Sequence, residues 1–419
     1  MTVRSSPGSP RRREPYDVIV VGARCAGSPT AMLLAREGLR VLLLDRASFP
    51  SDVVSSHLVH DGGAGCLERW GLLAAVRAIP VPAMSKDTFD FGLFSLSGSP
   101  ATVDGRPGPG TIAPPRIRLD ALLLAAAEQA GAEVRQDCRV TELLVEDGRV
   151  AGVRYRTSAG TVGAERAGLV VGADGRHSLV ARQVGAETYE AAPSLTCASY
   201  AYWTGLDVDQ LEASFTPDRF VTAFPTVDSL TCVYVAFPHD EQAVVRTDRG
   251  ESYRRALREA PAFRDRVGSA EQVTPCRGSA DLGTYYRRTW GPGWVLVGDS
   301  RHYQDPILAQ GIGNAFRDAE AVARAITTGL DGGSLRPELE AYERARTQET
   351  EPVYRFGQEV GAFRPTPRLA RLMLALQDDQ DATEAFIGAL AGTIPADAFF
   401  SAENTESIIA GALGSGETR

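Results

Sequence analysis

The sequence predicts an α/β fold that combines a parallel sheet, an inserted antiparallel sheet and C-terminal helices. Three observations lead to this prediction. A strand, a glycine-containing turn and a helix follow one another within 16–46, residues 189–277 place apolar side chains at every second position, and amphipathic helical spacing begins after residue 335. Strand–turn–helix units build parallel sheets, whereas period-two segments build antiparallel sheets with one buried face.

The boundaries of the first strand–helix–strand unit are well marked in the sequence. An apolar run at 18–21 predicts a buried strand, an amphipathic stretch at 27–37 predicts a helix, and a second strand is expected at 40–44. Pro29 suits the first helical turn, and Gly38 suits a left-handed helix cap. We therefore expect a βαβ unit at the start of the fold.

The turn of this unit, G-A-R-C-A-G, is an imperfect dinucleotide fingerprint. Gly22 and Gly27 fill the outer glycine positions, and Arg24 replaces the middle glycine. Asp45 lies near the spacing of about 20 residues at which a carboxylate binds an adenosine ribose. The helix N-terminus would offer N–H groups to a pyrophosphate, so we expect an adenine dinucleotide here. The alternative is an ordinary α/β crossover with a glycine turn.

The composition excludes several classes of protein. Of the 419 residues, 43% are apolar, which is ordinary for a globular chain with a substantial core. The net charge of −9 argues against a nucleic-acid partner. No apolar run approaches the roughly 18 residues of a membrane span, and no signal-type segment is found, so we expect a cytoplasmic protein without a membrane partner. Residues 1–15 are expected to be a disordered tail.

Metal binding is not expected. The cysteines are scattered without a C-x-x-C pair or any Cys/His ligand spacing, at Cys25, Cys66, Cys138, Cys197, Cys232 and Cys276. Each is interpreted as a small buried residue.

Between the first unit and the antiparallel region, the chain alternates loops, helices and short strands. A loop containing His57 and His60 leads into a helix expected at about 64–76, and residues 85–97 read as strand material. A helix is expected at 119–130, with Arg116 just ahead of it.

In two later segments, a predicted strand is followed by glycine and aspartate. Short strands with a hairpin at Asp147-Gly148 lead to GADG at 172–175. Farther on, WVLVGD at 294–299 is followed by an irregular loop and by a helix expected at 314–326, whose N-terminus points back toward that loop. We therefore expect an anionic or electron-rich group at that helix end.

Together, three segments resemble the FAD signatures of the group A flavoprotein monooxygenases, the aromatic hydroxylase family. They are GARCAG with Asp45, GADG at 172–175, and GD at 298–299 followed by P-x-x-x-Q-G at 306–311. The third departs from the family pattern at Leu308 and Ala309, where the family has glycines, and at Gly313, where it has asparagine.

The resemblance implies a Rossmann-like FAD-binding domain of the aromatic hydroxylase type, with an inserted antiparallel β-sheet substrate domain and C-terminal helices. It divides the chain into an FAD-binding domain (16–84, 106–188 and 278–330), a substrate domain (85–105 and 189–277) and a C-terminal helical region (331–419). The residues expected to bind FAD are Gly22, Ala23, Cys25, Ala26, Gly27, Asp45, Arg46, Arg116, Asp174, Gly298, Asp299, Pro306, Gly311, Ile312, Gly313 and Asn314.

The resemblance also implies an activity. It predicts an FAD-dependent monooxygenase, or hydroxylase, that uses NAD(P)H as a transient reductant and O2, through a flavin C4a-hydroperoxide, on an aromatic or polyketide-like small molecule of secondary metabolism. The catalytic candidates are His57, Tyr202 and His302, with His60, Tyr200 and Tyr303 as further pocket candidates. For His302 we favour a structural role in orienting the GD loop. A homodimer is a further hypothesis.

Three more functions remain open on this scaffold. The first is a flavin-dependent halogenase: these enzymes resemble the same fold and carry an Asp-Pro like Asp305-Pro306 here, and their catalytic lysine lies roughly where Lys86, the only lysine, falls. Their W-x-W-x-I-P segment is absent. The second is a double-bond reductase like the geranylgeranyl reductases, and the third is a non-redox FAD scaffold.

Overall fold

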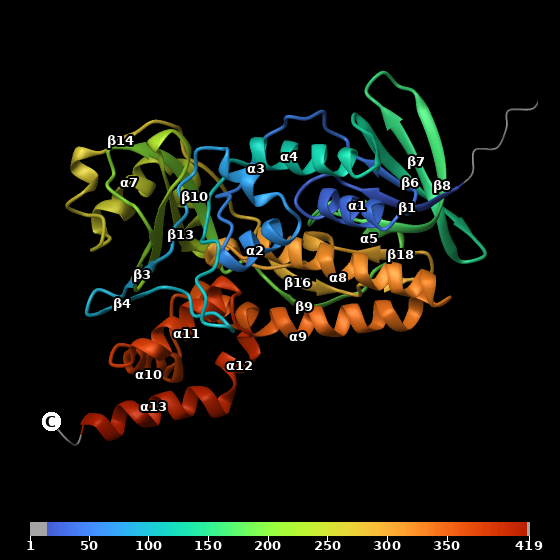
Figure 1. Cartoon of the computed structure of the whole chain (residues 1–419). Coiled ribbons are helices and arrows are strands. Elements are labelled where there is room, and N and C mark those ends of the chain that lie inside the picture. The colour runs from blue at the N-terminus through green and yellow to red at the C-terminus, as the bar shows by residue number, and fades with distance from the viewer. Residues whose placement is uncertain (1–14, 417–419) are drawn as a thin grey trace, which may run out of the picture.

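The computed structural model describes residues 15–416, so the predicted tail lies outside the described residues except for Pro15. The described chain contains three sheets, with helices beside them and a group of helices, α10–α13, gathered at one end (Figure 1). The mixed α/β fold class predicted from the sequence is confirmed.

The first sheet has the strand order β17-β18-β8-β1-β2-β5, with β6 and β7 attached through β8. β1 is parallel to both β2 and β8, so that Val20 lies opposite Leu43 on one side and Val171 on the other. The strands are β1 (Tyr16–Val21), β2 (Val41–Leu44), β5 (Glu133–Arg135), β6 (Cys138–Glu146), β7 (Arg149–Thr157), β8 (Val162–Gly172), β17 (Trp290–Gly291) and β18 (Trp294–Leu296).

Alternating side chains of this sheet fill two cores. Val18 and Val20 pack on one side against the helices α1 (Gly27–Arg36), α4 (Arg116–Gln129) and α8 (Gly311–Asp331). Ile19 and Val21 pack on the other side, against β6, β7 and α5 (Leu179–Gln183). Because both faces are covered at the centre of the sheet, residues 18–21 of β1 and 41–44 of β2 are continuously apolar, as expected for a buried parallel sheet.

Glycines with positive φ mark the turn between β6 and β7 and the break between α2 and α3. The hairpin predicted at Asp147-Gly148 joins β6 to β7, and both turn residues have positive φ. The helix expected at 64–76 is instead two helices, α2 (Asp61–Arg69) and α3 (Leu73–Arg77). Gly71 between them has a φ of +76°, a conformation that ends a right-handed helix.

The second sheet has the order β14-β10-β13-β12-β11-β3-β4, with β15 paired to β10. Its strands are antiparallel except for β11 beside β3. They are β3 (Asp87–Asp90), β4 (Ser95–Gly98), β10 (Thr196–Thr204), β11 (Leu211–Thr216), β12 (Arg219–Pro225), β13 (Thr231–Pro238), β14 (Glu271–Gln272) and β15 (Arg277–Ser279).

The two faces of the second sheet have different neighbours. One face packs against α7 (Arg249–Glu259), and α6 (Gln242–Thr247) lies beside it. The other packs against α9 (Leu335–Gly361) and the helices α10 (Pro367–Leu376), α11 (Gln380–Ala391) and α12 (Ala396–Phe400), with α13 (Ala402–Gly416) outermost. A third sheet contains β9 (Thr188–Ala192), β16 (Thr284–Arg287) and β19 (His302–Tyr303).

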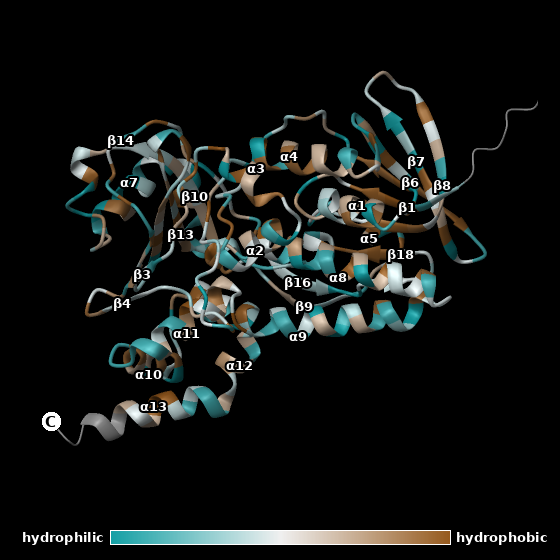
Figure 2. Ribbon diagram, in the orientation of Figure 1, coloured by the Kyte–Doolittle hydropathy of each residue, from teal (hydrophilic) through white to brown (hydrophobic). Residues whose placement is uncertain are grey.

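Hydropathy follows burial in this arrangement. In Figure 2 the buried strand β1 is mostly brown, whereas α9, which runs beside α8, is mostly teal or white. No helix among the described residues is long and apolar enough to cross a membrane. The division into an FAD-binding and a substrate domain stays a prediction.

Candidate active site

The turn between β1 and α1 has the geometry of an anion site. Gly22 has a φ of +101°, and a Cβ on Gly27 would lie 1.7 Å from the Gly22 carbonyl oxygen, so no side chain fits there. Among the described residues, no acceptor is hydrogen-bonded to the N–H groups of residues 24–26. Free N–H groups at a helix N-terminus attract phosphate.

Asp45 lies at the end of β2, beside this turn. Its carboxylate accepts hydrogen bonds from the N–H groups of Ala23 and Ala47, each at 2.7 Å. These bonds fix the carboxylate against the first residues of the turn. Arg46, the next residue, has an exposed side chain.

Asp120 is a residue that the sequence analysis missed. Its fully buried carboxylate receives two hydrogen bonds from Arg116, one from Arg24 at 2.7 Å and one from the Cys25 thiol at 3.3 Å. The Arg24 side chain also binds Ser51, so it points toward α4 and not into the turn. The i, i+4 spacing of Arg116 and Asp120 was the available signal.

In the second signature, GADG at 172–175, the Asp174 carboxylate caps the N-terminus of α5. Asp174 accepts hydrogen bonds from the Ser178 hydroxyl and from the N–H groups of Leu179 (2.7 Å) and Val180 (3.2 Å) at the start of α5. Burial raises the pKa of this carboxyl, and these hydrogen bonds oppose the shift. The position of the Asp174 side chain is therefore fixed by these hydrogen bonds to the start of α5.

Asp299, in the short helix Gly298–Ser300, has a different environment. No described residue donates a hydrogen bond to its carboxylate, which is only partly exposed. Burial raises its pKa to about 6, although the nearby charges of Arg116 and Arg176 oppose the shift. The carboxylate is thus held near two cations with its acceptor sites open.

The loop before α8 is tightly defined. Asp305 accepts a hydrogen bond from the Ile307 N–H at 3.0 Å and one from Thr196 at 2.7 Å, which fixes the short helix Pro306–Leu308. Ala309 follows with a φ of +53°, a left-handed conformation that favours glycine. At the start of α8, a Cβ on Gly311 would meet no atom within 4 Å.

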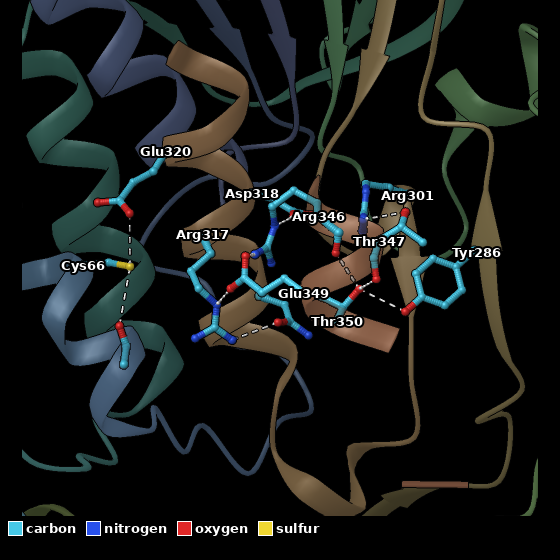
Figure 3. A network of polar contacts seen from close by, with 12 residues as sticks. Cys66, Tyr286, Arg301, Arg317, Asp318, Glu320, Arg346, Thr347, Glu349 and Thr350 are labelled. Carbon is cyan, nitrogen blue, oxygen red and sulfur yellow. Dashed lines mark hydrogen bonds and ion pairs between the residues drawn. The ribbon is translucent and has the colours of Figure 1, made fainter. Parts of the chain in front are cut away.

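A polar network with a buried Asp318–Arg346 pair at its centre joins α8 to α9 (Figure 3). Asp318 accepts hydrogen bonds from the Gly298 N–H at 2.9 Å and from Arg346 of α9 at 2.7 Å, and the Arg346 and Asp318 side chains are each 2% exposed. Glu349 pairs with both Arg346 and Arg317. The network therefore joins the loop around Gly298 to two packed helices.

An apolar cavity of about 480 Å³ lies between the second sheet, the loop before α8 and the helices α9–α11. The buried polar residues that line it are His60, Asp87, Thr222 and Tyr234. Most of the wall is aromatic or aliphatic, including Leu58, Phe89, Phe94, Leu211, Phe215, Phe220, Phe224, Pro306, Ile307, Leu308, Ala309, Phe356, Met373 and Phe386.

The predicted catalytic residues do not line this cavity. The His57 Nε2 lies 2.8 Å from the Tyr202 hydroxyl, and burial lowers the pKa of His57 to about 4. His302 is buried between Tyr286, on which it stacks at 4.1 Å, and Tyr354. The structure brings His57 and Tyr202 together, places His302 elsewhere, and leaves the catalytic role of all three a prediction.

A protein-family model described as "FAD binding domain" matches residues 15–356 of the chain. The chain belongs to this FAD-binding family. The predicted membership of a group A flavoprotein family is thereby confirmed, and the protein is an FAD-dependent oxidoreductase.

Relatives of this flavoprotein have several activities. It is 28% identical over 313 residues to digeranylgeranylglycerophospholipid reductase 2 of Methanopyrus kandleri, covering 71% of this chain and 73% of the relative. It is 25% identical over 340 residues to tryptophan 2-halogenase of Chondromyces crocatus, covering 78% of this chain and 64% of the relative.

Solved structures share the whole fold of this flavoprotein. The myxobacterial chondrochloren halogenase CndH is 24% identical, with a TM-score of 0.77 over 96% of this chain and 97% of that one. PqsL, a probable FAD-dependent monooxygenase from Pseudomonas aeruginosa, is 22% identical, with a TM-score of 0.69 over 91% of this chain and 99% of that one. At these identities the likeness concerns the fold.

The site residues of this flavoprotein fit FAD. The unpaired N–H groups at residues 24–26 match the needs of a diphosphate, and the glycines of the turn leave its approach clear. The open carboxylate of Asp299 matches the needs of a hydroxyl-bearing chain. Among the described residues, no group of three or more metal-ligating side chains occurs.

Proposed function

We propose that the protein is an FAD-dependent monooxygenase that hydroxylates an apolar aromatic or polyketide-like small molecule, with NAD(P)H as a transient reductant. Bound FAD would pass two electrons from NAD(P)H to O2, so that one oxygen atom enters the substrate and the other leaves as water. The apolar cavity that reaches Pro306–Ala309, at the loop before α8, carries this proposal.

The chain would hold FAD at the β1–α1 turn with Asp45, at Asp299 and at the start of α8. Gly22, Gly27 and the N–H groups between them would bind the diphosphate, and Asp45 would accept hydrogen bonds from the ribose. Asp299 would accept a hydrogen bond from the chain that leads to the flavin ring. The first turn of α8, residues 311–314, would place its N–H groups and the positive end of its dipole near that ring.

The cavity supplies what hydroxylation needs from a substrate site. Its wall is almost entirely apolar, so a bound substrate would displace water and shield the reaction from it. Aromatic rings from three strands, at Phe89, Phe215 and Phe220, offer edges and faces for a ring-containing substrate. These features support an aromatic or polyketide-like substrate.

The test begins with protein loaded with FAD. Oxidation of NADPH and of NADH is measured with and without O2 and with a panel of aromatic substrates, and products are analysed by mass spectrometry after reaction with isotopically labelled O2. We expect substrate-stimulated oxidation and a product that gains one labelled oxygen atom. Oxidation without any oxygenated product across the panel would count against hydroxylation.

A double-bond reductase is the second candidate, because the curated relatives include reductases of an isoprenoid lipid and the cavity is apolar enough for such a chain. This activity would add two hydrogen atoms to the substrate and would proceed without O2. A halogenase is disfavoured because Lys86 is exposed and does not line the cavity. Activity that depends on a halide and yields a halogenated product would support the halogenase function instead.

A further inference from the structure

Asp87, a buried acidic residue of the cavity wall, has no hydrogen-bond donor among residues 15–416, which the structure describes. Asp87 is the first residue of β3, is 2% exposed and lines the cavity wall. No described residue donates a hydrogen bond to its carboxylate. Asp87 therefore lies in the cavity wall with no donor for its carboxylate among the described residues.

The groups around Asp87 do not supply a counter-charge. Asp61, at the start of α2, is another buried carboxylate and repels it. His60 contacts the Leu308 carbonyl oxygen through Nε2, and burial lowers its pKa to about 4, so its ring is neutral near pH 7. The Tyr234 hydroxyl has no hydrogen-bond partner among the described residues. The cavity's one arginine, Arg364, is exposed at its edge.

An unpaired carboxylate at such a site is costly to bury. Transfer of an ionised carboxyl into an apolar environment without a hydrogen bond is unfavourable, and more so than transfer of a neutral polar group. Burial accordingly raises the pKa of Asp87 to about 7. A buried polar group without a partner, placed in the wall of a cavity, is therefore a strong candidate for contact with a ligand.

We propose that Asp87 is the polar anchor of the cavity and binds the hydroxyl or ammonium group of an otherwise apolar, ring-containing ligand. The ligand supplies the donor that the protein does not, and the aromatic wall holds its ring system. An anionic ligand is rejected, because its charge would lie beside an unpaired carboxylate. The inference rests on the proposed function only in taking this cavity as the substrate site.

The test uses three probes with one ring skeleton. Naphthalene has no polar group, naphthol has a hydroxyl donor and naphthoate has a negative charge. Binding to the FAD-loaded protein is measured by calorimetry and by perturbation of the flavin absorption spectrum, without NAD(P)H. At pH 8, above the pKa of about 7 of the Asp87 carboxyl, we expect the wild type to bind naphthol about tenfold or more tightly than naphthalene, since the buried carboxylate then accepts a hydrogen bond from the naphthol hydroxyl. Naphthoate should bind most weakly.

Two substitutions isolate the carboxylate. Asp87→Leu should abolish the preference for naphthol over naphthalene, and Asp87→Asn should remove the discrimination against naphthoate. Asp90→Asn is the matched control, because Asp90 lies on the same strand but its carboxylate binds Ser214 and the Gly92 N–H. Circular dichroism and thermal unfolding verify that each variant is folded.

The outcomes separate the anchor from the reaction. If Asp87→Leu keeps the naphthol preference, or if the wild type binds none of the probes, the assignment of Asp87 is overturned. If the preference depends on Asp87 but no substrate is oxygenated, the anchor stands and the monooxygenase proposal fails. If Asp87→Leu does not fold, Asp87→Asn, which preserves the shape of the side chain, decides alone: unchanged discrimination against naphthoate in that variant overturns the assignment.

Discussion

Lys86 and Asp87 are neighbours in the chain, yet only Asp87 lines the cavity; Lys86 is exposed. Asp87 begins β3, lies opposite Leu211 of β11 and is buried like Phe89 two residues later, whereas Lys86 precedes the strand and is exposed. This relationship favours a cavity with an acidic anchor over one with a catalytic lysine.

The first prediction concerns Lys86. Because its side chain is exposed, Lys86→Ala should leave the stability of the folded state unchanged. The rate of substrate-dependent NAD(P)H oxidation should stay within about twofold of the wild-type rate. Steady-state kinetics with and without chloride or bromide measure the effect. A loss of activity in Lys86→Ala together with a halide requirement would identify a halogenase.

The second prediction concerns the buried pair between Arg346 and Asp318. Arg346→Met leaves the Asp318 carboxylate with only the Gly298 N–H as partner, and should lower the free energy of unfolding by about 3–5 kcal/mol. Bound FAD should also dissociate more readily, because Gly298 is no longer braced. Urea denaturation and flavin retention on gel filtration measure both effects.

An exposed arginine provides the control for that experiment. Arg336 pairs with Glu340 on the surface of the same helix, so Arg336→Met should change the free energy of unfolding by less than about 1 kcal/mol. Equal effects of the two substitutions would mean that the buried network does not stabilise the site.

The third prediction concerns Gly311, at the start of α8. A Cβ here meets no protein atom within 4 Å, so Gly311→Ala should leave the stability of the apoprotein unchanged or slightly raised. If the flavin approaches this backbone, the methyl group should weaken FAD binding roughly tenfold or more. Titration of the apoprotein with FAD, followed by flavin fluorescence, gives the dissociation constant.

Gly411→Ala in α13 is the matched control, because its Cβ also meets open space but lies in a helix outside the site. Unchanged FAD affinity in Gly411→Ala with weakened affinity in Gly311→Ala locates the flavin at α8. The same affinity in both variants would place the flavin ring away from Gly311.

The fourth prediction concerns the pH dependence of stability at Asp87. Its pKa in the folded protein is about 7, above the ordinary value of 3.8, so the folded state binds a proton that the unfolded state has lost between these values. The wild type therefore loses stability as pH rises from about 4 to 7, by at most about 1.4 kcal/mol per pH unit from this group. The neighbouring groups Asp61, His60 and Tyr234 are the same in the wild type and in Asp87→Asn, so their own titration does not account for a difference between the two.

Asp87→Asn cannot lose that proton, so its advantage in free energy of unfolding over the wild type should grow between pH 5 and pH 8. Urea denaturation at both pH values measures the difference, with Asp90→Asn as the control for an amide on the same strand. A difference that does not change with pH would show that Asp87 is solvated or paired in solution.

Features governed by short-range rules could be predicted from the chain alone. The βαβ unit, its glycine turn and the hairpin at Asp147-Gly148 depend on apolar periodicity and on residues that tolerate positive φ, and these signals lie within a few residues of one another. The FAD-binding family was predictable for the same reason, because its three signatures are local. The break at Gly71 was missed, since glycine in an apolar helical pattern can also be tolerated.

The cavity and its polar partners depended on tertiary structure. Its wall brings β3, β11–β13, the loop before α8 and α9–α11 together across most of the chain. Asp120 reaches Arg24 and Cys25 of the fingerprint, and Arg346 reaches Asp318, only because the fold packs α4 and α9 against these segments. Asp87, not Lys86, faces the cavity because of strand register, which long-range pairing and burial of one sheet face decide.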